Sequence, residues 1–174
     1  MAKISFNKLG LTKQDEIKTI TLGENVIEVK QYLSVAQKGE IINHIVNNSI
    51  DDNNYYNPCK VMFFTDVELV LNYTNIGFTE KQKEAIDKPF DLMYENGLIA
   101  QIIELIPIEE RAYITKAVAD VIHSQYEYKN SARGILDAMA TDYSNLNFDI
   151  DELNRKIAAK ENIDLVSLIG DKLG

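Results

Sequence analysis

Two short segments near the N-terminus alternate between apolar and polar residues, and they constrain the fold more than any other feature of the chain. They are residues 17–22 (IKTITL) and residues 26–33 (VIEVKQYL), both rich in β-branched side chains. Such alternation is typical of strands, and the intervening Gly23-Glu24-Asn25 has the composition of a three-residue turn. The sequence therefore predicts a β-hairpin over residues 17–33. Residues 1–16 show no period and are expected to form an arm with some local order.

The hydrophobic period becomes helical directly after the hairpin. Ser34 and Gln37 match a capping box, and the apolar residues that follow predict a helix over residues 35–48. Asn57-Pro58 can start a second helix as its cap and first residue. Residues 59–73 fit either that helix or a buried strand around VMFF, and we favour the helix.

Helical patterns continue to the C-terminus. Thr79 and Gln82 form a second capping box, Pro89 opens a helix that Gly97 closes or bends, and residues 98–106 form an apolar segment before Pro107. The proline-free pattern over residues 108–143 predicts one long helix, with a kink at Ser131–Gly134. Asp149 and Asp164 begin two further helices.

These elements predict a mostly α (α+β) protein, in which an N-terminal β-hairpin precedes a bundle of about five to seven helices. At 174 residues with 45% hydrophobic residues, the chain has enough apolar material for one compact domain. That domain, residues 1–174, comprises four parts. They are the arm (1–16), the hairpin (17–33), a helical core (34–106), and the long helix with the C-terminal helices (108–174).

Charge and composition exclude several classes of function. The formal net charge is −9 and no basic stripe is present, so direct binding to nucleic acid is not expected. No run approaches the roughly 20 apolar residues that span a bilayer. The N-terminus lacks the apolar region of a secretory signal, and the single cysteine excludes a disulfide framework. We expect a soluble protein in a reducing compartment.

The polar segment SIDDNNYYNP, residues 49–58, is a candidate cation-binding loop. A calcium loop requires oxygen ligands at alternating positions, a glycine at the sixth position and a glutamate at the twelfth. Counted from Asp51, the fifth and sixth positions are Tyr55 and Tyr56, and the twelfth is Met62. The pattern fails, and the segment is interpreted as a connecting loop.

A second candidate is Asp120, His123 and Glu127, whose spacing places them on one face of the long helix. Such a set could contribute to a divalent-metal site or to acid–base chemistry. One helix does not supply a full coordination sphere, so a solvated polar face is the favoured interpretation, and no metal or cofactor is expected.

Other catalytic patterns are missing from the sequence. Cys59 has no recognisable histidine context, no serine lies in a Gly-x-Ser-x-Gly elbow, and the glycines form no phosphate-binding loop. Glu109 and Glu110 suit a helix N-terminus through the helix dipole. We therefore expect a non-enzymatic protein.

Aromatic residues in polar surroundings are the remaining candidates for function. Tyr55, Tyr56, Tyr126 and Tyr128 are candidate interaction residues, because tyrosine is enriched at protein contact surfaces. Packing of these rings onto the core is the alternative. The apolar segments at residues 98–106 and 163–173 require a partner, either within the chain or in another subunit.

Four segments carry a resemblance to known proteins: MAKISFNKLGL (1–11), IKTITLGENVIEVKQYLSVAQKGEIINHIV (17–46), NYTNIGFTEKQK (72–83) and YENGLIAQIIELIP (94–107). They resemble a group of small proteins encoded by phages of Gram-positive bacteria. Among phage structural modules, a hairpin followed by packed helices in an acidic chain is similar to tail assembly chaperones. That resemblance implies a helper that coats the tape-measure protein and self-associates while the tail tube grows. Neck components of the virion are a further match, and no functional residue carries over.

We therefore expect a phage virion assembly or structural protein that acts through contacts with other phage structural proteins and forms a homo-oligomer. It would act in the host cytoplasm during assembly or remain in the virion. The alternative is an acidic, phage-encoded inhibitor of a host defence system that mimics DNA. Such a mimic would gather acids on one face, whereas here they alternate with lysines, as in residues 80–84 (EKQKE).

Overall fold

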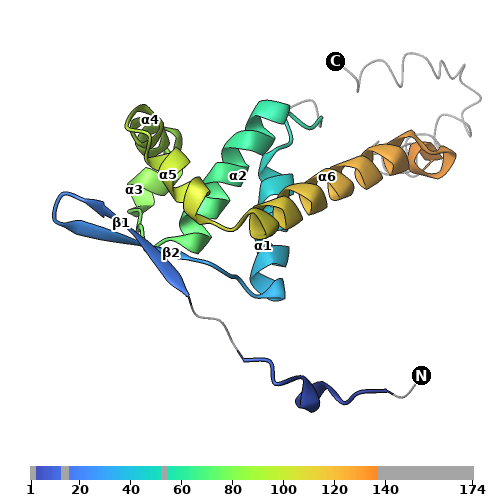
Figure 1. Ribbon diagram of the computed structural model, residues 1–174. Coiled ribbons are helices and arrows are strands. Elements are labelled where there is room, and N and C mark those ends of the chain that lie inside the picture. The colour runs from blue at the N-terminus through green and yellow to red at the C-terminus, as the bar shows by residue number, and fades with distance from the viewer. Residues whose placement is uncertain (1–2, 13–15, 52–54, 137–174) are drawn as a thin grey trace, which may run out of the picture. The chain divides into compact units, whose positions relative to one another are not determined.

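The computed structural model describes residues 3–12, 16–51 and 55–136. The chain divides into two compact units, Met1–His123 and Ser124–Gly174, which are described separately here. The structure confirms the predicted class, a mostly helical protein with an N-terminal two-stranded antiparallel hairpin (Figure 1). The interpretation as one domain stays a prediction.

The hairpin of the first unit consists of β1 (Ile17–Leu22) and β2 (Asn25–Lys30). Leu22 pairs directly with Asn25, so the connecting turn has two residues, Gly23 and Glu24. The predicted three-residue loop was therefore wrong. Gly23 has φ 61°, the left-handed conformation that two-residue hairpin turns require and that glycine adopts without strain.

β2 ends at Lys30, three residues earlier than predicted. Gln31 still donates its backbone N–H to the Glu16 carbonyl, but the chain then turns toward the first helix. Leu33 remains buried although it lies outside the strand. Its N–H is bonded to a carboxylate of α6 instead of a neighbouring strand, which accounts for the early end.

The outer edge of β2 is closed by the segment that follows α2. Thr74 forms an isolated bridge with Val29. The Asn75 side-chain amide accepts from the Glu28 N–H at 3.0 Å and donates to the Val26 carbonyl at 3.3 Å. Asn75 thus replaces a neighbouring strand with one side chain.

The first two helices begin as the sequence predicts. In α1 (Val35–Asn48), Ser34 and Gln37 form the capping box. In α2 (Pro58–Tyr73), the Asn57 side chain accepts from the N–H groups of the first turn, and Pro58 is the first residue. Residues 59–73 are helical, which confirms the favoured of the two interpretations.

Three short helices follow. Thr79 and Gln82 form the predicted capping box of α3 (Glu80–Glu84). α4 (Asp87–Glu95) begins two residues before Pro89, so the proline lies within its first turn instead of opening it. Gly97, with φ 67°, separates α4 from α5 (Leu98–Leu105).

α6 (Ile108–Asn130) is shorter than the helix predicted over residues 108–143. Within the second unit, Ser131 interrupts it at the position where a kink was predicted, and its hydroxyl accepts from the Gly134 N–H. Residues 132–136 are helical again. Residues 137–143 and the helices predicted from Asp149 and Asp164 lie outside the described residues.

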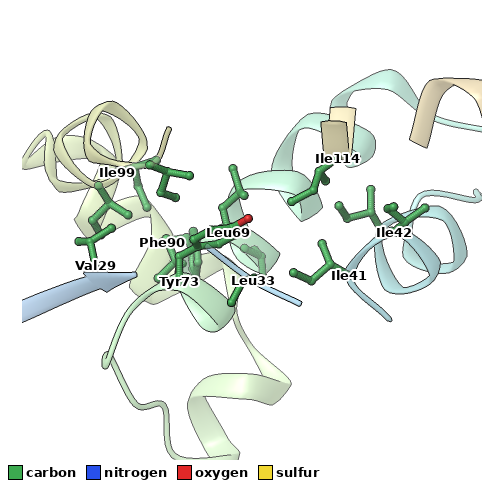
Figure 2. Packing of buried hydrophobic residues seen from close by; sticks show 14 of the residues in the cluster. Val29, Leu33, Ile41, Ile42, Leu69, Tyr73, Phe90, Ile99 and Ile114 are labelled. Atoms are coloured by element: carbon green, nitrogen blue, oxygen red, sulfur yellow. The ribbon is translucent and has the colours of Figure 1, made fainter. Parts of the chain in front are cut away.

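The core of the first unit joins β2 to five of its helices, and no single helix face accounts for it. Val29, Leu33, Tyr73, Phe90 and Ile99 are at most 2% exposed. Figure 2 shows them with Ile41, Ile42, Leu69 and Ile114 in one cluster. The apolar segment 98–106 is thus covered within the chain, through Leu98, Ile99, Ile102 and Ile106. The segment 163–173 lies outside the described residues.

Candidate functional site

An ion pair lies within the first unit, between α1 and the first turn of α6. Lys38 Nζ is 2.5 Å from Glu110 Oε1, and the two side chains are 8% and 11% exposed. Charged residues are almost never buried unless they are paired. The pair therefore holds the N-terminus of α6 against α1.

The other oxygen of Glu110 receives two donors. The Tyr73 hydroxyl donates to Oε2 at 2.9 Å, and the Leu33 N–H donates to the same atom at 3.2 Å. Burial, and then the hydrogen bond to Glu110, raise the pKa of Tyr73 far above its ordinary value, so the phenol stays protonated. Lys38, Tyr73, Glu110 and the Leu33 N–H are called the Glu110 cluster below.

Two tyrosine rings lie beside the cation of this cluster. Lys38 Nζ is 4.5 Å from the centroid of the Tyr32 ring and 5.3 Å from that of Tyr113. Both distances are within the range of cation–π attraction. The two tyrosine residues are 52% and 51% exposed, whereas Lys38 and Glu110 are buried.

The polar groups of the Glu110 cluster are bonded to one another. Each carboxylate oxygen accepts hydrogen bonds from the chain itself, and Glu110 is 8% exposed. A fully partnered carboxylate has little to offer a substrate, whereas it fixes the elements that carry its donors. The cluster therefore holds α1, α2 and α6 together beside the exposed Tyr32 and Tyr113.

Sequence reasoning missed this cluster. In the sequence, the helix dipole alone accounts for Glu110, and Lys38 belongs to no motif. A signal was present, because Lys38 stands three, four and seven residues before Ile41, Ile42 and Ile45, on the buried stripe of α1. A lysine at such a position requires a buried carboxylate partner.

Two further carboxylates, both on α2, are partly removed from water. Glu68 Oε1 lies 3.4 Å from His44 Nδ1, and the Asn72 amide donates to Oε2 at 2.9 Å. Burial raises the pKa of Glu68, and the attraction of His44 and the bond from Asn72 only partly oppose it. Asp66 accepts from the Tyr94 hydroxyl at 2.6 Å, and burial raises its pKa too.

The three candidate residues on α6 fall in both units, with Asp120 and His123 in the first and Glu127 in the second. Asp120, His123 and Glu127 are exposed, and Asp120 Oδ2 accepts from Lys116 Nζ one turn earlier at 3.1 Å. Among the residues that the structure describes, no group of three histidine, cysteine, aspartate or glutamate side chains could hold a metal ion. Asp120 has a local ion pair with Lys116, and the interpretation of the three residues as a solvated face stays a prediction.

The described ends of the polar segment between α1 and α2 pair with each other. Asp51 donates its N–H to the Tyr55 carbonyl at 2.8 Å, and its carboxylate accepts from the Tyr55 N–H, also at 2.8 Å. Ile50 and Tyr56 form an isolated bridge. The Asp51 carboxylate is thus engaged with the local backbone, as expected of a turn residue.

The four tyrosines predicted as contact residues differ in exposure. Tyr55, Tyr126 and Tyr128 are 68%, 60% and 50% exposed, and Tyr56 is half-buried. Tyr126 and Tyr128 belong to the second unit. Their role in contacts stays a prediction. Cys59 is exposed on the first turn of α2.

Comparison with protein-family models, with curated proteins and with solved structures found no match to this chain. Of the helices in the described ranges, none combines the length and the apolar character that crossing a bilayer demands.

Proposed function

We propose that this protein is a non-enzymatic phage virion assembly or structural component that acts through protein contacts, as a tail assembly chaperone or a neck component. Its partners would be other phage structural proteins and further copies of itself, met in the host cytoplasm during assembly. The proposal is supported mainly by the apolar side chains that residues 3–12 present to solvent. Ile4, Phe6, Leu9 and Leu11 are 74%, 73%, 52% and 72% exposed.

Four large apolar side chains within eight residues are unusual on an isolated protein. Burying each of them would contribute on the order of 1.5–3 kcal/mol. The short 3-10 helix in this segment, Phe6–Leu9, has no buried residue. A segment of this kind gains most of its stabilisation when a partner covers it.

The aromatic surface beside the Glu110 cluster points to the same class of function. Tyr32 and Tyr113 are held by the cation of Lys38 with half of each ring exposed. Tyrosines that are already ordered lose little conformational entropy on binding, which is why they are frequent at interfaces. The inward-directed charges of the cluster support a scaffold and not a reaction centre.

Light scattering of the full chain over a concentration series tests the proposal. We expect a ring-sized oligomer, or a mass that grows with concentration. A mass that remains that of one chain at every concentration would contradict the assembly function. It would favour the alternative function, inhibition of a host defence protein, which the net charge of −9 would support.

A further inference from the structure

The second edge of the hairpin is open among the described residues. The bond from the Gln31 N–H to the Glu16 carbonyl makes these two residues a hydrogen-bonded pair. Hydrogen-bonded and non-hydrogen-bonded pairs alternate along an antiparallel ladder. With the observed register, the backbone groups of Ile17, Thr19 and Thr21 therefore point away from β2.

The edge of β2 confirms which backbone groups point outward, and it shows how the outer edge of a strand is closed. Val26 and Glu28 pair with Thr21 and Thr19, so their backbone groups also point outward, and the Asn75 amide bonds both of them. Within the part of the chain that the structure describes, β2 is the one strand paired with β1. Five of the six residues of β1 are exposed. Such an edge is a template for another strand.

The arm, defined as residues 3–12, would pair with this edge once its 3-10 helix Phe6–Leu9, which has no buried residue, extends. In the extended arm, Ile4 and Phe6 lie on one face and Leu9 and Leu11 on the other, because the members of each pair stand two positions apart. Extended at about 3.3 Å per residue, the arm is longer than β1, whose six residues it would cover.

Charge and turn chemistry favour a second copy as the partner. The arm carries Lys3 and Lys8 and no acidic residue, whereas the whole chain has a net charge of −9. The arm is therefore attracted to acidic residues of another copy, although two whole copies repel each other. Return of the arm to its own β1 would need a tight turn within residues 12–16 (TKQDE). That segment lacks glycine, asparagine and proline, and Asp15 is its one residue of a type that such turns favour.

We propose that the arm of one copy adds a strand to the open edge of β1 in a second copy. This inference rests on the proposed function, because it names the contact through which copies associate. Each copy has one arm and one edge, so the exchange can be reciprocal in a dimer or can continue head to tail along an assembly.

Three full-length variants test the contact by light scattering. Phe6→Asp with Leu11→Asp removes the apolar side chains of the arm. Thr19→Pro removes an N–H that points outward and is not used in pairing with β2. Leu92→Asp is the matched control, because Leu92 is an exposed apolar residue of α4, 62% exposed. We expect association at least tenfold weaker in the first two variants and unchanged in the control.

Amide hydrogen exchange provides a second measurement that does not depend on whether Thr19→Pro folds. In the unmodified chain we expect the amides of Ile17, Thr19 and Thr21 to become protected as concentration rises. The arm variant should lose that protection. Protection at all concentrations would show pairing within one chain and would overturn the proposal.

The failures of the two proposals are distinguishable. If the chain forms oligomers that both variants leave intact, the arm contact is overturned and the assembly function stands. If the unmodified chain remains monomeric without protection at the edge, both are overturned.

Discussion

Glu110 stabilises the first unit in two ways at once. Its carboxylate lies on the first turn of α6, where the helix dipole favours a negative charge, and it neutralises Lys38. The second role dominates, because an uncompensated buried charge costs far more than a dipole interaction contributes. The contribution of Glu110 to stability therefore depends on Lys38 in α1.

Glu110→Gln should destabilise the chain by about 3 kcal/mol, because it leaves the buried ammonium of Lys38 without a countercharge. Urea unfolding followed by circular dichroism measures this change. Glu109→Gln is the matched control, since Glu109 is the exposed neighbour on the same turn. Equal midpoints for the two variants would contradict the assigned role.

Replacing Glu68 by glutamine should stabilise the chain at neutral pH, in contrast to Glu110→Gln, which should destabilise it. Burial raises its pKa, so the folded chain holds the proton more tightly than the unfolded chain does. The resulting stabilisation is present at low pH and is lost as pH rises through the raised pKa. We expect Glu68→Gln to be more stable than the unmodified chain at about pH 7, and to lose that advantage below the ordinary carboxyl pKa of about 4.3. A less stable Glu68→Gln at neutral pH would refute this.

At the scale of elements, two glycines illustrate how backbone conformation decides the effect of the same substitution. Gly97 separates α4 from α5 with φ 67°, whereas Gly39 lies inside α1, and a Cβ at Gly39 would meet nothing within 4 Å. In the left-handed backbone conformation any residue with a Cβ is destabilised relative to glycine. In the interior of a helix, alanine is more stable than glycine.

Gly39→Ala should therefore stabilise the chain by about 0.5–1 kcal/mol, and Gly97→Ala should destabilise it by about 1 kcal/mol. Thermal unfolding of the two variants beside the unmodified chain measures both. Each variant serves as the control for the other, because both replace glycine by alanine. Shifts of the same direction would contradict the assigned conformations.

At the scale of the whole molecule, stability should depend on alkaline pH through Tyr73. Its phenol is buried and bonded to Glu110, so its pKa in the folded chain is raised, while in the unfolded chain it ionises near about pH 10. The stabilisation is complete below the unfolded pKa and decreases as pH rises above it.

Tyr73→Phe should lose about 1.5 kcal/mol at neutral pH, the value of a hydrogen bond to a charged group, and its stability should fall less steeply above about pH 10. Denaturant unfolding at several alkaline pH values measures the slope. Tyr55→Phe, at an exposed position, should follow the unmodified chain. Parallel slopes for Tyr73→Phe and the unmodified chain would refute the role of Tyr73.

The sequence by itself determined the local structure. Alternation over residues 17–30, the capping boxes at Ser34 and Thr79, and Asn57-Pro58 each specify an element through contacts a few residues apart, so the fold class could be predicted. The break in the long helix could also be predicted from the local residues Ser131–Gly134, where the Gly134 N–H bonds to the Ser131 hydroxyl.

Only the tertiary structure decided which polar groups meet. Glu110 and Lys38 are 72 residues apart in the chain, and Asn75 closes the edge of β2 from 47 residues beyond Glu28. No periodicity relates such positions, because the pairing depends on how helices pack around a shared core. The strand edge left open by that packing is, for the same reason, invisible in the sequence of β1 alone.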